Sequence, residues 1–266
     1  MPLEIRSSFW PDAAMPIYVI PDIHGHRAML EQALRRIASD GATDADEVIF
    51  LGDFIDRGPD SRGVIEILSQ GREAGRNWSF LMGNHDRMMR RYLLDGTATD
   101  AAVKSGIPWT HNRFGGAAFR SYGVDPTAAQ SPEALHAALV AAVPRSHVDF
   151  LATLSLTLIR DELLFVHAGI RPGIALADQS EDDLVWIRGE FLNHPDPHPW
   201  LVVHGHTALP APRHFGNHID LDGGAGMGRE LFPAVFEDGI CHMLTAEGRQ
   251  ILPVTPLAPD EPAPWA

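Results

Sequence analysis

Aspartate, asparagine and histidine recur in five short segments of this sequence, each placed where a β-strand is expected to end. Four of the segments come directly after a run of mostly β-branched or large apolar residues, and the fifth, at 83–86, follows the shorter run 78–82. In an open α/β sheet, ligands bind beyond the carboxyl ends of the strands. We therefore expect the polar side chains of these segments to converge on one place. The segments are PDIHG at 21–25, GDFIDRG at 52–58, GNHD at 83–86, VHAG at 166–169 and HGHT at 204–207.

The side chains in these segments are typical ligands of a dinuclear metal site. Asp22 and His24 are two residues apart, so in an extended chain they point to the same side and can reach one ion. Asp53 supplies a carboxylate whose two oxygens can bridge two ions. This mixture of imidazole and carboxylate suits Mn, Fe or Zn, and we expect two divalent ions, with Mn²⁺ preferred. Held about 3.5–4 Å apart, they would clamp a phosphoryl group and generate hydroxide near neutral pH. The predicted ligands are Asp22, His24, Asp53, Asn84, His167 and His206.

Four further side chains suit the other needs of phosphate-ester hydrolysis. His85 comes after the ligand Asn84 and is the candidate general acid for the leaving group. Asp56 lies three residues after Asp53 and could hold the imidazole in its acid form, because a nearby carboxylate raises the pKa of a histidine. Arginine matches phosphate bidentately. We therefore assign substrate phosphate binding to Arg57 and Arg188, together with the amide of Asn84.

The elements that position these segments alternate between strand and helix in the first half of the chain. Apolar runs at 17–20 and 48–51 predict strands. A helix is predicted after each, at 27–39 and at 61–70, with Gly71 as the expected end of the second. Such alternation implies parallel strands joined by right-handed crossovers.

The pattern changes between about residues 87 and 150, where we expect a mostly helical insertion beside the site. Helical patches at 87–94 and 132–143 flank a stretch rich in glycine and aromatic residues at 109–122. Within this stretch, Trp109 is interpreted as core or lid packing. The stretch as a whole is also the candidate location of an aromatic slot for a nucleobase.

The rest of the chain is predicted to contain a hairpin at 154–166, a helix capped by Ser180 that runs to Arg188, and then mostly strands. We interpret 1–252 as a single domain. The Pro- and Ala-rich segment 253–266 is expected to form an irregular or disordered tail.

Together, the five segments resemble the calcineurin-like metallophosphoesterases, within the phosphoprotein phosphatase branch that includes the lambda-type protein phosphatase and the diadenosine-tetraphosphate hydrolases. The resemblance covers about 17–236 and rests on Asp-x-His-Gly, Gly-Asp-x-x-Asp-Arg-Gly and Gly-Asn-His in this order. It implies an α/β fold, a four-layer αββα sandwich, with the ligand, acid and arginine roles given above. Relatives often carry Trp-x-x-Asn-Gly-Gly in the insertion, whereas here Arg113 and Phe114 stand between Asn112 and Gly115.

Composition narrows the classes of partner. The chain has 266 residues and a formal net charge of −14, which argues against binding to duplex nucleic acid through basic side chains. A single cysteine, Cys241, cannot form an internal disulfide and fits a reducing compartment. No apolar run approaches the roughly 20 residues of a membrane helix. We expect a cytoplasmic protein that acts on a phosphorylated protein or a small phosphorylated substrate.

Two substrates fit the same chemistry. The first interpretation is a phosphomonoesterase, a Ser/Thr protein phosphatase in which metal-bound hydroxide attacks phosphorus directly, without a phosphoenzyme. The alternative is a bis(5'-nucleosyl)-tetraphosphatase that cleaves a phosphoanhydride of dinucleoside polyphosphates. A binding module without catalysis is disfavoured, because such proteins usually lose a ligand or the acid, and all are present here.

Two residues keep open roles. His204 stands two before His206, and we interpret it as a supporting or structural residue in preference to a metal ligand. Arg171 lies shortly after His167, where it could contact phosphate or brace its loop, and the sequence favours neither role.

Overall fold

Two mixed β-sheets form the centre of the molecule. The computed structural model describes residues 15–258, 261 and 263–265. In the larger sheet, β1, β2 and β3 are parallel and the other strands pair antiparallel. The order is β11-β10-β9-β1-β2-β3, with β1 (Ile17–Ile20), β2 (Glu47–Phe50), β3 (Trp78–Phe80), β9 (Ala234–Glu237), β10 (Ile240–Thr245) and β11 (Gly248–Ile251).

The second sheet also has parallel strands at its centre, because β5, β6 and β8 run in the same direction while β4 and β7 pair antiparallel at its edges. The predicted hairpin is therefore present as β4 and β5. The order is β4-β5-β6-β8-β7, with β4 (Thr157–Arg160), β5 (Leu163–Val166), β6 (Leu201–His204), β7 (Arg213–His214) and β8 (His218–Asp220).

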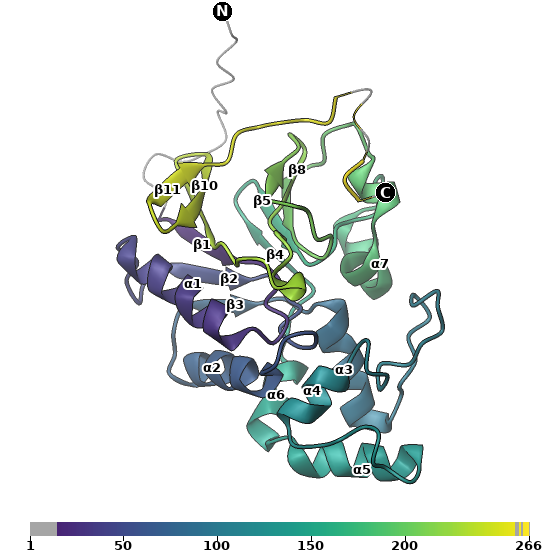
Figure 1. The fold of residues 1–266 in the computed structure, drawn as a ribbon. Coiled ribbons are helices and arrows are strands. Elements are labelled where there is room, and N and C mark those ends of the chain that lie inside the picture. Colours follow the sequence, from purple (N-terminus) through teal and green to yellow (C-terminus); the bar gives the residue numbers. More distant parts are fainter. Residues whose placement is uncertain (1–14, 259–260, 262, 266) are drawn as a thin grey trace, which may run out of the picture.

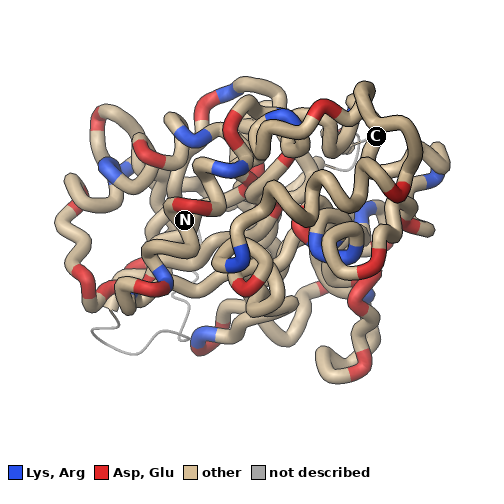
Figure 2. Tube along the Cα trace, turned by 90° about the horizontal axis from the view of Figure 1, so that it is seen from below, with Lys and Arg blue, Asp and Glu red and all other residues tan. Residues whose placement is uncertain are grey.

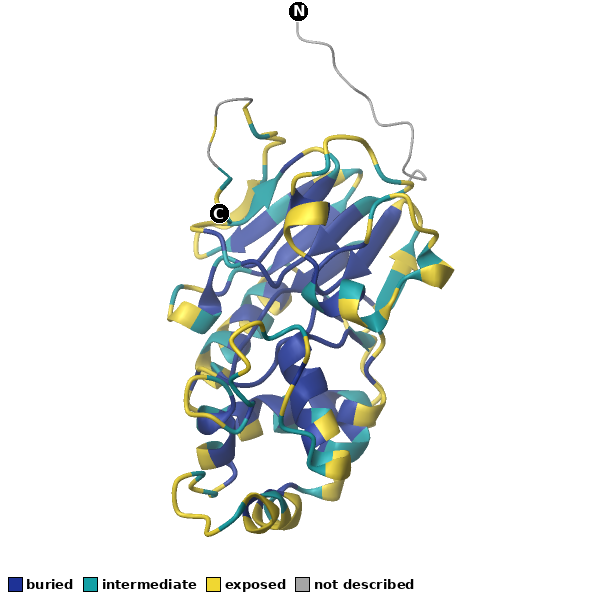
Figure 3. Cartoon of the chain, turned by 90° about the vertical axis from the view of Figure 1, so that its right-hand side faces the viewer, coloured by how far each residue is buried: buried dark blue, intermediate teal, exposed yellow. Residues whose placement is uncertain are grey.

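The layering results from side-chain alternation along strands that are buried on both faces. In β1, Tyr18 and Ile20 pack on the helical side, whereas Ile17 and Val19 pack between the two sheets. This double burial explains why these strands are continuous apolar runs in the sequence. Figure 3 shows that the strands are largely buried while the outer helices and loops carry the exposed residues.

Helices complete the two outer layers, so the predicted αββα sandwich is confirmed (Figure 1). The helices α1 (Arg27–Ser39) and α2 (Ser61–Glu73) cover the larger sheet. The short helices α7 (Glu181–Trp186) and α8 (Gly189–Leu192) cover the second sheet, and η1 (Leu176–Asp178) precedes them.

The region between β3 and β4 is helical, in the arrangement α3 (Asn84–Asp95), α4 (Gly116–Ser121), α5 (Pro132–Ala142) and α6 (Arg145–Ala152). These helices pack on one another and on α2 (Figure 1). Arg87 of α3 is buried and lies 2.8 Å from Asp100 and 2.6 Å from Asp182. This ion pairing ties the helical region to the start of α7.

Some local predictions were wrong. The helix α3 begins at Asn84, not at residue 87, so two predicted site residues lie in its first turn. Gly71 does not end α2; a Cβ there would lie 2.0 Å from the ring of Trp78, so this glycine permits close packing instead. Ser180 does cap α7, accepting from the Asp183 N–H, but the helix ends at Trp186, before Arg188.

The described part of 253–266 has no helix or long strand, but it is attached to the domain. The backbone N–H of Thr255 donates to the His214 carbonyl at 2.7 Å. The indole of Trp265 donates to Asn193 at 3.1 Å.

Acidic and basic residues are intermixed along the chain trace (Figure 2). Among the helices that the structure describes, none has the length and apolar character needed to cross a membrane.

Candidate metal centre

The site loops leave the parallel strands in a backbone conformation that is uncommon outside glycine. His24, Asp53 and His206 have φ values of 48°, 50° and 66°, and Asp56 and Arg57 have 71° and 62°. Such left-handed conformations cost energy for non-glycine residues and cluster at functional sites. Neighbouring loops hold them in place, since the His24 N–H donates to the Asp53 carbonyl at 2.8 Å.

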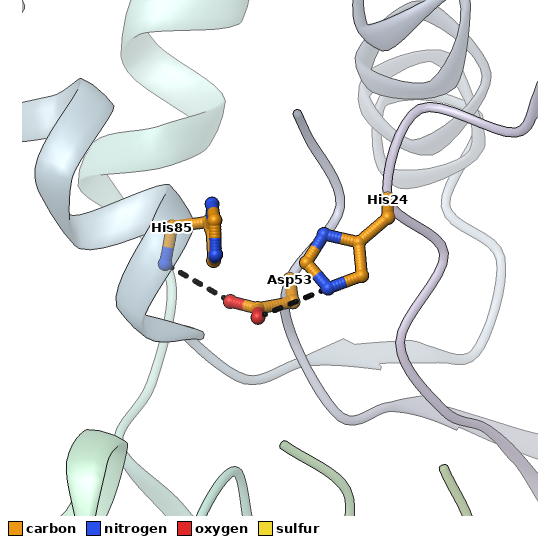
Figure 4. A group of neighbouring side chains, drawn as sticks. All are labelled: His24, Asp53 and His85. Carbon is orange, nitrogen blue, oxygen red and sulfur yellow. Dashed lines mark hydrogen bonds and ion pairs between the residues drawn. The ribbon is translucent and has the colours of Figure 1, made fainter. Parts of the chain in front are cut away.

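The carboxylate of Asp53 is shared between two groups of histidines. Its Oδ2 lies 3.4 Å from Nε2 of His24, and its Oδ1 lies 3.5 Å from Nε2 of His167. Two sets of ligand atoms therefore meet at Asp53: one with His24 and His85, the other with His167 and His206, each set within 4.8 Å. Figure 4 shows Asp53 between His24 and His85. A carboxylate in this position can bridge two cations.

The other predicted ligands lie in the same cluster. Oδ1 of Asn84 is 3.1 Å from Nε2 of His167 and 2.9 Å from Nδ1 of His206. Oδ2 of Asp22 is 3.8 Å from Nε2 of His24, and Oδ1 accepts from the backbone N–H of His206 at 3.1 Å. The structure thus brings together all six side chains that the sequence proposed as ligands, and all six are buried.

The electrostatics of this cluster fit bound cations. Burial, and after it the charges of Asp222 and Asp53, raises the pKa of the Asp22 carboxyl well above its usual value. Burial also lowers the pKa of His24 and His206 well below that of a free imidazole. At Asp53 burial alone raises the pKa, but the neighbouring histidines outweigh it and the pKa is lowered. Buried carboxylates among neutral imidazoles are the donor set of transition-metal and zinc sites.

His85 and Asp56 form a close pair beside this cluster. Nδ1 of His85 lies 2.6 Å from Oδ2 of Asp56, and both side chains are buried. Burial alone lowers the pKa of His85, but the charge of Asp53 and the hydrogen bond and charge of Asp56 outweigh it, so the pKa is raised. His85 also belongs to one of the two sets of possible ligand atoms, so the geometry permits both an acid and a ligand role.

Sequence reasoning missed the third member of this arrangement. The indole Nε1 of Trp109, in the helical region, donates to the same Oδ2 of Asp56 at 2.8 Å. Trp109 is buried, in agreement with the packing role that the sequence indicates, but it also makes this polar contact. The signal that could have found it is the indole N–H, which needs a partner when buried.

The two predicted phosphate-binding arginines lie at the exposed edge of the buried cluster. Arg188 donates to Nε2 of His206 at 3.1 Å and to its carbonyl at 3.3 Å. The side chain of Arg57 lies against the loop of η2 (Ala225–Met227), where a Cβ on Gly226 would be 2.9 Å from Cδ of Arg57. Both guanidinium groups can therefore meet solvent and a substrate anion while staying next to the ligands.

The side chains of His204 and Arg171 make their contacts outside the cluster of predicted metal ligands. Nε2 of His204 lies 2.9 Å from Nδ1 of His218, and its ring belongs to neither set of ligand atoms. Arg171 pairs with Asp183 at 2.6 Å and with Glu190 at 2.5 Å. The geometry therefore agrees with a structural position for His204 and a bracing position for Arg171.

Asp222, just beyond the end of β8, is a buried carboxylate that the sequence-based site does not include. Burial raises the pKa of its carboxyl to about 6. Its Cβ is 3.8 Å from the position that a Cβ on Gly205 would take, and its charge acts on Asp22. The pattern at the end of β8, Ile219-Asp220-Leu221-Asp222, was the available signal.

Comparison with known proteins agrees with this geometry. Residues 15–225 match the family model described as calcineurin-like phosphoesterase. The asymmetrical bis(5'-nucleosyl)-tetraphosphatase PrpE of Bacillus velezensis is 28% identical over 237 residues, which cover 80% of this chain and 86% of that protein. A symmetrical bis(5'-nucleosyl)-tetraphosphatase of Janthinobacterium is 29% identical over 159 residues, 59% of this chain but only 45% of that relative's length.

Two further similarities carry less information, the first because it covers a short part of the chain and the second because its sequence identity is low. Serine/threonine-protein phosphatase 1 of Salmonella typhimurium is 37% identical over 73 residues, which cover 27% of this chain and 30% of that protein. Among solved structures, a cold-active protein-tyrosine phosphatase of a psychrophilic Shewanella matches with a TM-score of 0.59 and 17% identity, covering 92% of this chain and 83% of that one. This last similarity concerns the fold alone.

Proposed function

We propose that this chain, which belongs to the calcineurin-like phosphoesterase family, hydrolyses a phosphoanhydride bond of dinucleoside polyphosphates. Family membership and the two His/Asp clusters make it a metal-dependent phosphoesterase. The finer assignment of substrate is supported by relatives of that activity, one of which aligns over 80% of this chain. It replaces the protein phosphatase interpretation as our first choice, because the Ser/Thr phosphatase relative aligns over only 27%.

The observation that carries the chemistry is the shared carboxylate of Asp53, with its two oxygens facing His24 and His167. When bound, two divalent ions supply Lewis acidity to the phosphoryl group and activate water. The residues proposed to hold the ions are Asp22, His24, Asp53, Asn84, His167 and His206.

The remaining residues have proposed roles around the reacting phosphate. Arg57 and Arg188, with the amide of Asn84, bind and orient its non-bridging oxygens. His85 donates a proton from its imidazole to the leaving oxygen, and Asp56 orients that imidazole through the 2.6 Å contact to Nδ1. In a phosphoanhydride the leaving group is itself a phosphate, which needs less protonation than an alkoxide. The contribution of His85 is therefore expected to be smaller for this substrate than for a phosphoserine.

The test is a side-by-side turnover assay with the Mn-loaded protein. One arm contains diadenosine tetraphosphate and the other a phosphoserine or phosphothreonine peptide, with product nucleotides separated by chromatography. We expect a higher kcat/KM for the dinucleotide and no turnover by Asp53→Asn. Faster release of phosphate from the peptide would overturn the proposal in favour of a protein phosphatase. The ratio of products also shows whether cleavage is symmetrical, giving ADP alone, or asymmetrical, giving AMP and ATP.

A further inference from the structure

We infer that the cavity between Phe114 and Trp186 binds a nucleobase of the substrate. The inference rests on the proposed function and adds to it the place where the nucleoside lies. The cavity has a volume of about 670 Å³ and is bounded by the helical region on one side and by α7 and α8 on the other. This volume is within the usual range for sites that bind small molecules.

The cavity opens directly beside the metal centre. The ring of Phe114 is 6.3 Å from the ring of His85, and the ring of Trp186 is 5.9 Å from the ring of His206. Arg188 lines the cavity and also contacts His206. A polyphosphate chain held by Arg188 would therefore lead towards the cavity mouth, with its nucleoside entering the cavity.

The charges around the cavity favour an anionic chain leading into it. The acidic residues in its wall are already paired, Asp183 and Glu190 with Arg171 and Asp182 with Arg87. Within the described part of the chain, neither Lys104 nor Arg188 has a carboxylate partner, and both line the cavity. Lys104 and Arg188 can therefore interact with an anionic substrate, although the chain as a whole carries a net charge of −14.

The apolar part of the wall suits a flat aromatic ring. Phe114, Trp186 and Val103 are partly buried, pack on the hydrophobic core and line the same cavity. A base gains stability by stacking on aromatic side chains whatever its identity, because every base has a π-face. Of the aromatic stretch 109–122, Trp109, Phe119 and Tyr122 are 1%, 0% and 4% exposed and cannot stack on a ligand. Phe114 is therefore the aromatic residue of this stretch that can stack on a base, and Trp186 of α7 is a second candidate that the sequence did not indicate.

Phe114→Leu tests the inference, because it keeps an apolar side chain but removes the aromatic face. The probe is a methylene-bridged, non-hydrolysable analogue of diadenosine tetraphosphate, titrated calorimetrically into Mn-loaded protein. We expect Kd to rise about tenfold or more in Phe114→Leu, as loss of one stacking contact predicts. Phe114→Trp should bind within about twofold of the wild type. Val140→Ala, a change at an exposed position of α5, serves as the control for unrelated surface changes. Equal metal content and circular dichroism spectra exclude misfolding.

The outcomes separate this inference from the proposed function. Equal Kd values for the wild type and Phe114→Leu, or no binding at all, would overturn the inference, whether or not the dinucleotide is hydrolysed. Binding that depends on an aromatic residue at 114 without turnover of diadenosine tetraphosphate would support the nucleobase site and overturn the proposed function. If a phosphopeptide binds with an affinity that Phe114→Leu weakens and the analogue does not bind, the cavity is a peptide groove and the inference is wrong.

Discussion

Trp109 and His85 donate to one and the same carboxylate oxygen, Oδ2 of Asp56, at 2.8 and 2.6 Å. Trp109 comes from the segment between α3 and α4, His85 from the first turn of α3 and Asp56 from the loop after β2. The other oxygen of Asp56 is buried without a partner in the described part of the chain. The orientation of this carboxylate therefore depends on two donors, and the helical region between β3 and β4 supplies both of them.

Replacement of Trp109 by Phe should impair catalysis without disturbing the metal ligands. The phenyl ring keeps much of the apolar packing but loses the hydrogen bond to a charged group, which is worth about 1.5–3 kcal/mol. Only part of that energy bears on the orientation of His85, so we expect kcat for a phosphomonoester such as a phosphoserine peptide to fall about tenfold, with KM and metal content unchanged. Steady-state kinetics and elemental analysis check this. Trp200→Phe is the matched control, and an equal loss in both variants would indicate a general packing effect.

His85→Asn should lower kcat for a phosphomonoester such as a phosphoserine peptide by about two orders of magnitude or more, because asparagine cannot donate a proton to the leaving oxygen. Metal content should stay largely intact. Elemental analysis of the variant is informative because the atoms of His85 also fit one set of possible ligands. Loss of metal from His85→Asn would show that this histidine is a ligand and that our acid assignment is wrong.

Asp53→Asn should weaken both ions together, since its carboxylate faces His24 on one side and His167 on the other. An amide has one oxygen for coordination, so it cannot bridge as a carboxylate does. Metal content measured after gel filtration should fall from two equivalents towards zero. His206→Ala, which removes a ligand from only one of the two sets, is the comparison and should retain about one equivalent. Retention of one ion by Asp53→Asn would argue against a bridging role.

Acid should destabilise the fold through the buried pair of His218 and His204. Burial, and after it the charge of His204, lowers the pKa of His218 to about 2. Below the ordinary histidine pKa of about 6.5, this histidine binds a proton in the unfolded chain but stays neutral in the folded chain. The free energy of unfolding therefore falls as the pH falls from about 6.5 towards 2. The slope for one such group is at most about 1.4 kcal/mol per pH unit. Urea unfolding at about pH 7, 6 and 5 should show a shallower decline for His218→Gln than for the wild type, because glutamine does not titrate; parallel declines would contradict this.

Much of the site could be predicted from the sequence because its ligands lie in short motifs at strand ends. Asp22 and His24 are two residues apart, and a buried parallel strand is visible as an apolar run. Within each of the two sheets, the residues directly after such runs then lie at one edge, beyond the carboxyl ends of the parallel strands. The predicted start of α3 was wrong because its first turn begins with Asn84 and His85, which are poor helix formers.

The alternation of strands and helices, the metal-type ligands and the residues suited to phosphate could be inferred before any coordinates, since each depends on local periodicity or on short spacing. The four-layer αββα arrangement was implied by the resemblance to a known family. Contacts between residues distant in the chain could not be inferred from the sequence. Trp109 donates to Asp56 across 53 positions of the chain, and Phe114 and Trp186 line one cavity from separate elements. The physical reason is that such contacts depend on how the helical region and α7 pack against the sheets, and packing between elements distant in the chain leaves no periodic trace in the sequence.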